Sequence, residues 1–161
     1  MLPKRLKRGV VATIVLGRAW IDAPRRALLR RMVAFSRALP DQFNQPLPET
    51  MASLTPSSQA TTALPMPEKE IRQLADAVAA WHIRSPLGIC LRRSLLRYYF
   101  LREANIPVQV IFGARIKDAA EGGGIGGHAW LTLHGTPYYE NPADYQGFVI
   151  MYTYPQLEAQ A

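Results

Sequence analysis

The hydrophobic period of the chain changes once, near Asn105, and this change constrains the fold more than any other feature. Up to Asn105, apolar residues recur at the spacing of amphipathic helices, as in residues 71–81. Beyond it, residues 106–116, rich in β-branched residues, and residues 128–133 are expected to be strands, separated by a glycine-rich loop at 117–127. Helices followed by consecutive strands are typical of the α+β class. We therefore expect N-terminal helices and a small antiparallel sheet.

Proline and apolar spacing set the expected element boundaries. Pro24 should divide the first helical stretch in two, with Asp22 capping the second helix, and Ser85 with Pro86 should open the last helix. The expected helices are residues 4–39 with this break, Pro67 to near His82, and 87–103. The apolar stripe expected for the first helix is Val10, Ile14, Gly17 and Ile21. Further strands are expected from Tyr138 to Glu140 and from Phe148 to Tyr154.

The net charge of +7 is concentrated at the N-terminus. Residues 1–43 hold ten Lys/Arg and two Asp, and the remainder holds nine Lys/Arg and ten Asp/Glu, so the two parts carry +8 and −1. This asymmetry argues against nucleic-acid binding by the whole chain and favours a local contact with an acidic peptide, protein or lipid surface. The arginines form either a solvated helix face or a docking surface for a partner. The docking candidates are Arg25, Arg26, Arg30 and Arg31.

Composition also suggests how the chain is divided. Residues 40–67 mix six prolines with Ser, Thr and Gln, as linkers do. We expect basic helices at 1–43, a Pro/Ser/Thr-rich linker at 44–67 and the main domain at 68–161. The apolar run that begins at Gly9 ends after nine residues, whereas a membrane span needs about 20. We therefore expect no span and no secretion, and the single cysteine fits a reducing cytoplasm.

Cys90 is the strongest candidate for a chemical role. A thiol attacks as the thiolate, which the positive end of a helix and a nearby imidazole both favour. Cys90 lies at the expected start of a helix, followed by Arg92 and Arg93. His128, at the expected start of a strand beside the glycine-rich loop, can take the thiol proton. The alternative is a small buried cysteine and a structural histidine.

An imidazole base also needs an acceptor that orients it. With a turn at 134–136, residues whose numbers sum to about 268–270 pair across a hairpin, and this places Glu140 beside His128. Asn141 and Asp144 are alternatives by residue type. A regular strand would point Asn141 to the other face, and Asp144 is expected in a loop.

No metal or cofactor site is expected. Cys90, His128 and His134 lack the spacing of a zinc site. His82, at a helix end, needs no more than a capping or surface role. The glycines at 122–127 lack the following Lys-Ser/Thr of a phosphate loop.

Four motifs in this order resemble the transglutaminase-like lasso-peptide leader peptidases. They are Cys-Leu-Arg-Arg-Ser-Leu at 90–95, a strand at 106–113 that opens with Ile-Pro, Gly-His-Ala-Trp-Leu at 127–131, and Gly-Thr-Pro at 135–137. The family pattern is Cys-Leu-x-Arg-Ser-Leu, a Gly-Ile-x-Ala-type strand, His-Ala-Trp-Val-Glu and Asp-Gly-x-Pro. The resemblance covers residues 86–142 well.

The resemblance implies a papain-like α+β fold with a Cys-His-Asp triad, and it makes residues 68–161 the cysteine peptidase domain. It carries Cys90 over as nucleophile and His128 as base. The third position falls on Glu140, where the family usually has Asp. Two departures bear on substrate fit. The glycine-rich loop before His128 is enlarged, and Thr132 stands where the family has Glu.

The resemblance also implies partners. Such proteins remove the leader from a ribosomally made precursor peptide, so that an ATP-dependent lasso cyclase can use the new amine. In split systems a separate small protein binds the leader. The first 67 residues are expected to be helices and linker rather than such a module, so we expect the separate protease half. The residues seen require no cofactor, and dependence on nucleotide is left open.

Two other functions stay open on the sequence. One is a catalytically silent peptide-binding module of the same fold, against which the intact Cys-His-Glu set argues. The other is a transglutaminase-like acyltransferase, in which an amine rather than water accepts the acyl group. Contact of the basic helices with a membrane surface is a further interpretation, and it is compatible with the peptidase function.

Overall fold

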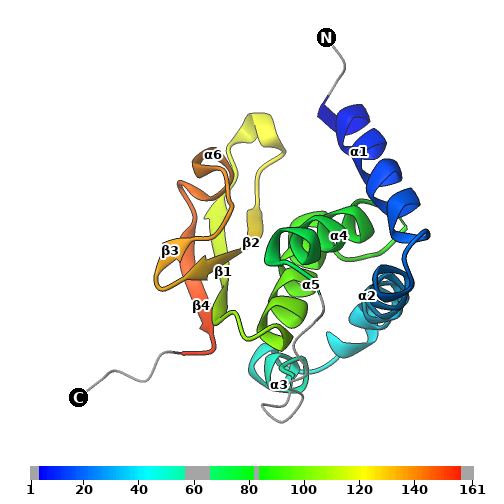
Figure 1. Cartoon of the computed structure of the whole chain (residues 1–161). Coiled ribbons are helices and arrows are strands. Elements are labelled where there is room, and N and C mark those ends of the chain that lie inside the picture. Colours follow the sequence, from blue (N-terminus) through cyan, green and yellow to red (C-terminus); the bar gives the residue numbers. More distant parts are fainter. Residues whose placement is uncertain (1–3, 57–65, 82–83, 157–161) are drawn as a thin grey trace. The chain divides into compact units, whose positions relative to one another are not determined.

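The computed structural model describes residues 4–56, 66–81 and 84–156, with the side chains of 4–11 left aside. Expectations that fall on His82, on Val10 and on the linker residues 57–65 lie outside this description. The chain forms two compact units, Met1–Ile106 and Pro107–Ala161. The first is helical and the second is built on a sheet (Figure 1).

The helical unit is organised around α4 and α5. Its helices are α1 Lys4–Ala19, α2 Ala23–Gln42, α3 Leu47–Ser53, α4 Glu68–Trp81 and α5 Ile89–Glu103. Helix α4 contacts α1, α2 and α5, and its buried residues include Ile71, Leu74 and Val78, as the apolar spacing predicted. Helix α5 is buried on most sides. Arg97 is buried there, and its Nε and Nη2 donate to Asp76 on α4 at 2.6 and 2.7 Å.

The break near Pro24 is confirmed, but the cap predicted for Asp22 is wrong. Pro24 lies in the first turn of α2, and Asp22 occupies the N-cap position without a side-chain hydrogen bond to the backbone. A carboxylate oxygen of Asp22 instead lies 3.8 Å from a guanidinium nitrogen of Arg25. The arginine therefore competes with the backbone amides for this carboxylate.

The apolar stripe predicted for α1 is rotated in the structure. Ala12, Leu16 and Ala19 are buried, whereas Ile14 is 57% exposed and Ile21 is 85% exposed. Helical spacing identifies the helix but not the face that packs. Small alanines let backbones approach closely, and α1 packs against α4.

The segment expected to be an irregular linker contains a helix. Helix α3 begins after Pro46, and the Thr50 hydroxyl bonds the carbonyls of Gln42 and Gln45 at 3.0 and 3.2 Å. The prediction of irregular structure is therefore wrong over Leu47–Ser53. The domain division proposed from composition stays a prediction.

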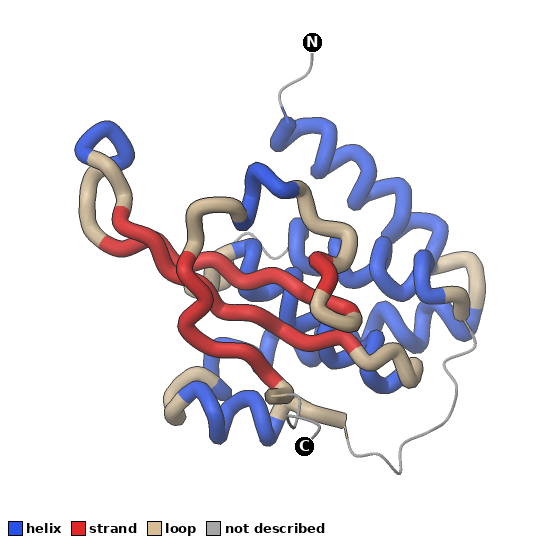
Figure 2. The backbone as a smooth tube through the Cα atoms, turned by 90° about the vertical axis from the view of Figure 1, so that its left-hand side faces the viewer, coloured by secondary structure: helices blue, strands red, loops and turns tan. Residues whose placement is uncertain are grey.

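The sheet unit contains an antiparallel sheet, so the α+β class is confirmed. Its strands are β1 Val108–Ile116, β2 Ile125–Leu133, β3 Thr136–Pro137 and β4 Val149–Tyr154, in the order β3-β2-β1-β4. The strands lie side by side in Figure 2, and the hairpin of β1 and β2 extends beyond the others. Both ends of this order are edges, and β4 forms one of them.

The glycine-rich loop is shorter than expected because β2 begins at Ile125. Ile125 pairs with Ile116, and Gly127 with Ala114. The connection is a 3-10 turn, η1 Ala119–Glu121, followed by three glycines with positive φ at 122–124. An L residue with a side chain rarely adopts such φ values, so glycines are needed there.

The predicted turn after β2 is confirmed, but the third strand is shorter than predicted. His134 and Gly135 have φ of 50° and 76°, and Leu133 pairs with Thr136 in the predicted register. Strand β3 ends at Pro137, and Tyr139 has φ of 51°. The strand expected at Glu140 is therefore wrong. Asp144, expected in a loop, lies in helix α6, Pro142–Tyr145.

Candidate active site

Cys90 lies in the first turn of α5, as predicted. The helix begins at Ile89 after Gly88, three residues beyond Pro86, because the Ser85 hydroxyl instead accepts the Leu87 amide at 3.3 Å. A methyl group on Gly88 would lie 3.8 Å from the Cys90 Sγ. The thiol is thus close to the amino end of α5, where unpaired amides favour negative charge.

Arg92 anchors the turn that carries Cys90. It is buried, with Nε donating to the Leu87 carbonyl at 3.1 Å and Nη1 to the Ala79 carbonyl of α4 at 2.9 Å. Burial lowers the pKa of Arg92, and the interaction with Cys90 opposes that shift. The guanidinium therefore fixes this turn and places a positive charge within electrostatic reach of the thiol.

His128 lies in the middle of β2, so its predicted place at a strand start is wrong. Its Cα partner on β1 is Gly113. The imidazole lies between two rings, with centroids 5.8 Å from Trp130 and 5.3 Å from Phe148. Trp130 also stacks at 5.9 Å on Tyr145 of α6. Ring packing from three segments therefore orients the imidazole.

Gly113 makes this ring stack possible. A Cβ at Gly113 would lie 2.7 and 2.8 Å from atoms of the Trp130 ring and 3.1 Å from the Phe148 Cβ. Real Cβ atoms essentially never approach so closely. A glycine inside a strand is a recognised sign of close approach, so the sequence holds a signal for this role of Gly113 that was missed above.

His128 opens into a pocket formed by the sheet unit. The pocket has a volume of about 660 Å³. Its lining residues are Arg115, Ile116, His128, Ala143, Asp144, Gln146, Gly147, Phe148 and Val149. Asp144 thus shares the pocket with His128 and is exposed there, whereas Glu140 is half-buried and is not among the described residues that line it.

The alternation of side chains between the two faces of a strand, which predicted Glu140 beside His128, does not continue as far as Glu140. The ladder continues from β3 only as far as Tyr138, whose amide donates to the Leu131 carbonyl at 2.8 Å. The positive φ of Tyr139 then ends the regular alternation of faces. The strand register therefore gives no support for Glu140 as the orienting acid. This role of Glu140 stays a prediction.

The glycine-rich loop is tied to the pocket through Arg115. The Arg115 guanidinium pairs with Glu121 of η1 and lies 5.3 Å from the centroid of the Phe148 ring. This hydrogen bond raises the pKa of Arg115 and lowers the pKa of Glu121. Glu121 and Asp118 also form a capping box. The enlarged loop therefore has a defined conformation beside the pocket.

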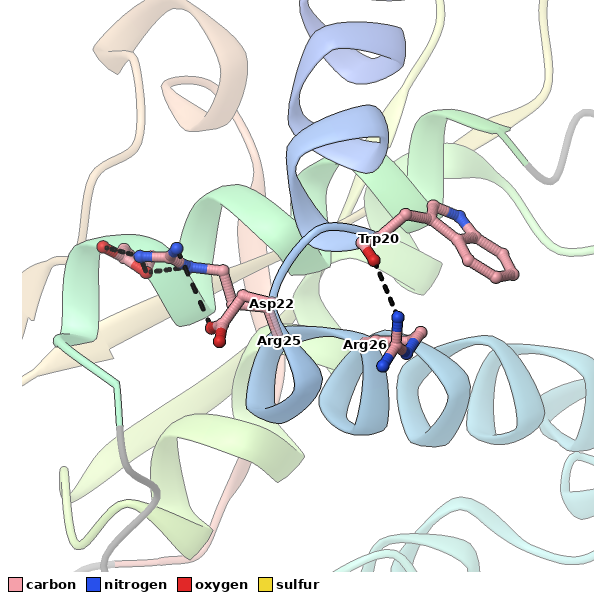
Figure 3. A network of polar contacts seen from close by, with 5 residues as sticks. Trp20, Asp22, Arg25 and Arg26 are labelled. Atoms are coloured by element: carbon pink, nitrogen blue, oxygen red, sulfur yellow. Dashed lines mark hydrogen bonds and ion pairs between the residues drawn. The ribbon is translucent and has the colours of Figure 1, made fainter.

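Most of the arginines predicted to dock a partner make contacts within the helical unit. Figure 3 shows Arg25 reaching Asp22, and Arg26 reaching the main chain at Trp20. Arg25 also donates to both carboxylate oxygens of Glu70 at 2.9 and 3.0 Å. Arg31 pairs with Glu103, and Arg30 is exposed. Docking through this helix stays a prediction and would compete with these contacts.

Two absences hold for the described part of the chain. No group of three or more His, Cys, Asp or Glu lies close enough there to hold a metal ion. None of its helices is both long and apolar enough to cross a bilayer.

Cys90 and His128 lie in different compact units, each described by itself. A cysteine and a histidine are residue types that serve as nucleophile and base in acyl transfer, and both lie here in an α+β chain. The family model of the transglutaminase-like superfamily matches residues 29–153, and the chain belongs to this superfamily. The superfamily includes cysteine proteases and acyltransferases. Neither the curated proteins nor the solved structures contain a significant match.

Proposed function

We propose that this chain is a cysteine endopeptidase that removes the leader from a ribosomally made lasso precursor peptide. The observation that carries the proposal is Cys90 in the first turn of α5, within a chain of the transglutaminase-like superfamily. The motif order around Cys90 and His128 resembles the leader peptidases of that superfamily. Its expected partners are the precursor, a separate leader-binding protein and the ATP-dependent cyclase, and its expected location is the cytoplasm.

The reaction proposed for Cys90 and His128 proceeds in two steps. The Cys90 thiolate attacks the scissile carbonyl carbon, and the imidazolium of His128 gives its proton to the leaving amine as the C–N bond breaks. A thioester joins the leader to Cys90. His128 then takes a proton from water, the water oxygen attacks the thioester, and the thiolate leaves. The amine released first is the new N-terminus of the core peptide.

We propose Glu140 as the acid that orients His128. An orienting carboxylate works best when it is shielded from water, since screening weakens its interaction with the imidazolium. Glu140 is half-buried and Asp144 is exposed. The exposed Asp144 is better suited to contact substrate in the pocket.

Reconstitution with a lasso precursor peptide and a leader-binding protein tests the proposal. Mass spectrometry of the products should show one cut at the leader–core junction by the wild type. Cys90→Ala should show none, with an unchanged far-UV circular dichroism spectrum. Leader cleavage retained in Cys90→Ala would refute the assignment of the nucleophile.

Acyl transfer is the second candidate, because the superfamily includes acyltransferases. The chemistry is the same up to the thioester, and only the nucleophile that takes the acyl group differs. A leader released with a free carboxylate indicates hydrolysis. A leader joined to an added primary amine indicates transfer.

A further inference from the structure

Within the described residues of the sheet unit, the outer edge of β4 pairs with no other strand. Strand β4 pairs with β1 on one side and is the last strand in the sheet order. Every second residue of an edge strand directs its amide and carbonyl away from the sheet, which makes the edge a template for another strand. Over six residues, this edge offers about 20 Å of backbone for pairing.

The side chains of this edge strand are neutral and apolar. Residues 145–156 contain no charged side chain, in a chain with a net charge of +7. Val149, Ile150 and Met151 are 58% to 67% exposed. Natural proteins usually protect such edges with lysine or proline because uncharged edges invite aggregation. Because β4 lacks that protection, we expect another extended segment to pair with its outer edge.

The edge leads directly into the pocket of His128. Phe148 and Val149, where β4 begins, both line that pocket, and Phe148 packs on the imidazole at 5.3 Å between centroids. An extended peptide paired with β4 would therefore pass from the strand edge into the pocket.

We propose that the outer edge of β4 binds an extended, apolar segment of the precursor peptide by strand addition. This inference rests on the proposed peptidase function and adds where the substrate backbone is held. Main-chain hydrogen bonds supply the affinity, and exposed side chains such as Ile150 and Met151 select apolar residues at alternate positions of the peptide.

A second copy of the chain fits this edge less well than a peptide. The β1–β4 pairing shifts register between Phe112 and Gly113, which leaves Met151 as an extra residue in β4. Such a bulge bends and twists the strand. A flexible peptide can follow a bent edge, whereas edge-to-edge pairing of two folded sheets needs a straight one.

Met151→Lys tests the proposal in the reconstituted cleavage reaction. A lysine on the edge should hinder strand addition and lower kcat/KM for the precursor about tenfold, mainly through KM. The matched control is Ile14→Lys, an apolar position that is 57% exposed but lies on helix α1, outside the sheet unit. We expect its kcat/KM to stay within about twofold of the wild type, since exposed substitutions away from a site have small effects.

Hydrogen exchange tests the docking site on β4 without relying on correct folding of Met151→Lys. In Cys90→Ala, the precursor should slow amide exchange along β4. Wild-type kcat/KM in Met151→Lys, or unchanged exchange along β4, would overturn the docking site and leave the peptidase intact. A dimer that Met151→Lys dissociates without changing kcat/KM would assign the edge to a second copy and also overturn it. Absence of any Cys90-dependent cleavage would overturn the proposed function and the docking site together.

Discussion

Cys90 and His128 are held in place by different kinds of structure. Cys90 takes its position from backbone close to it in the chain, as the second residue of α5 beside the buried Arg92. His128 takes its position from the rings of Trp130 and Phe148, which come from different segments of the chain. These rings pack beside Gly113. The place of Cys90 is therefore a local property of the sequence, and the place of His128 is a property of the assembled sheet.

Among the residues that would support Cys90 and His128, Glu140, the proposed orienting acid, has the largest expected effect. Glu140→Gln should lower kcat about a thousandfold, because the imidazole loses the charge that fixes its tautomer. Asp144→Asn, the matched control in the same pocket, should lower kcat only a few-fold. Steady-state kinetics on the precursor measures both. The reverse ranking would move the orienting role to Asp144.

The substitution Arg92→Met tests whether Arg92 anchors the backbone around Cys90. Arg92→Met leaves the carbonyls of Leu87 and Ala79 without this donor, which should cost about 3 kcal/mol of unfolding free energy. The exposed Arg30→Met should change it by less than about 0.5 kcal/mol. Urea denaturation followed by circular dichroism measures both variants. Equal stabilities would contradict the anchoring role of Arg92.

Gly113 tests the ring packing around His128. Gly113→Ala forces Trp130 or Phe148 to move, at a cost of about 1–3 kcal/mol. A displacement of about 1 Å at the base should lower kcat about a hundredfold. Gly127→Ala is the control, because a Cβ there meets nothing within 4 Å. Tryptophan fluorescence and kcat together report the shift, and wild-type values in Gly113→Ala would contradict it.

The difference between Cys90 and His128 explains which features of the fold and site the sequence could predict. The place of Cys90 in the first turn of a helix, the break near Pro24 and the turn at His134 follow from neighbouring residues, and each was confirmed. The rotation of α1, the end of β3 before Glu140 and the packing of Phe148 on His128 depend on distant contacts. Periodicity carries no information about such contacts.

The smallest expected effect is the pH dependence of the conformation of the glycine-rich loop. Arg115 holds the pKa of Glu121 below its ordinary value. The pair therefore stabilises the loop above the ordinary glutamate pKa of about 4.3, and this stabilisation is lost as the pH falls through the lower folded value. Glu121→Gln should remove this pH dependence. Chemical shifts of the loop amides between pH 7 and pH 3, about the range of this titration, measure it. Identical titrations in wild type and variant would contradict the pairing.

Cys90 and His128 are proposed to act as one pair. The chain has a single cysteine, so intact mass after treatment with iodoacetamide near neutral pH reports Cys90 alone and needs no substrate. We predict that His128→Asn slows alkylation about tenfold, because the imidazole no longer favours the thiolate. His134→Asn, at the turn after β2, should alkylate at the wild-type rate. Equal rates in all three proteins would contradict the pairing.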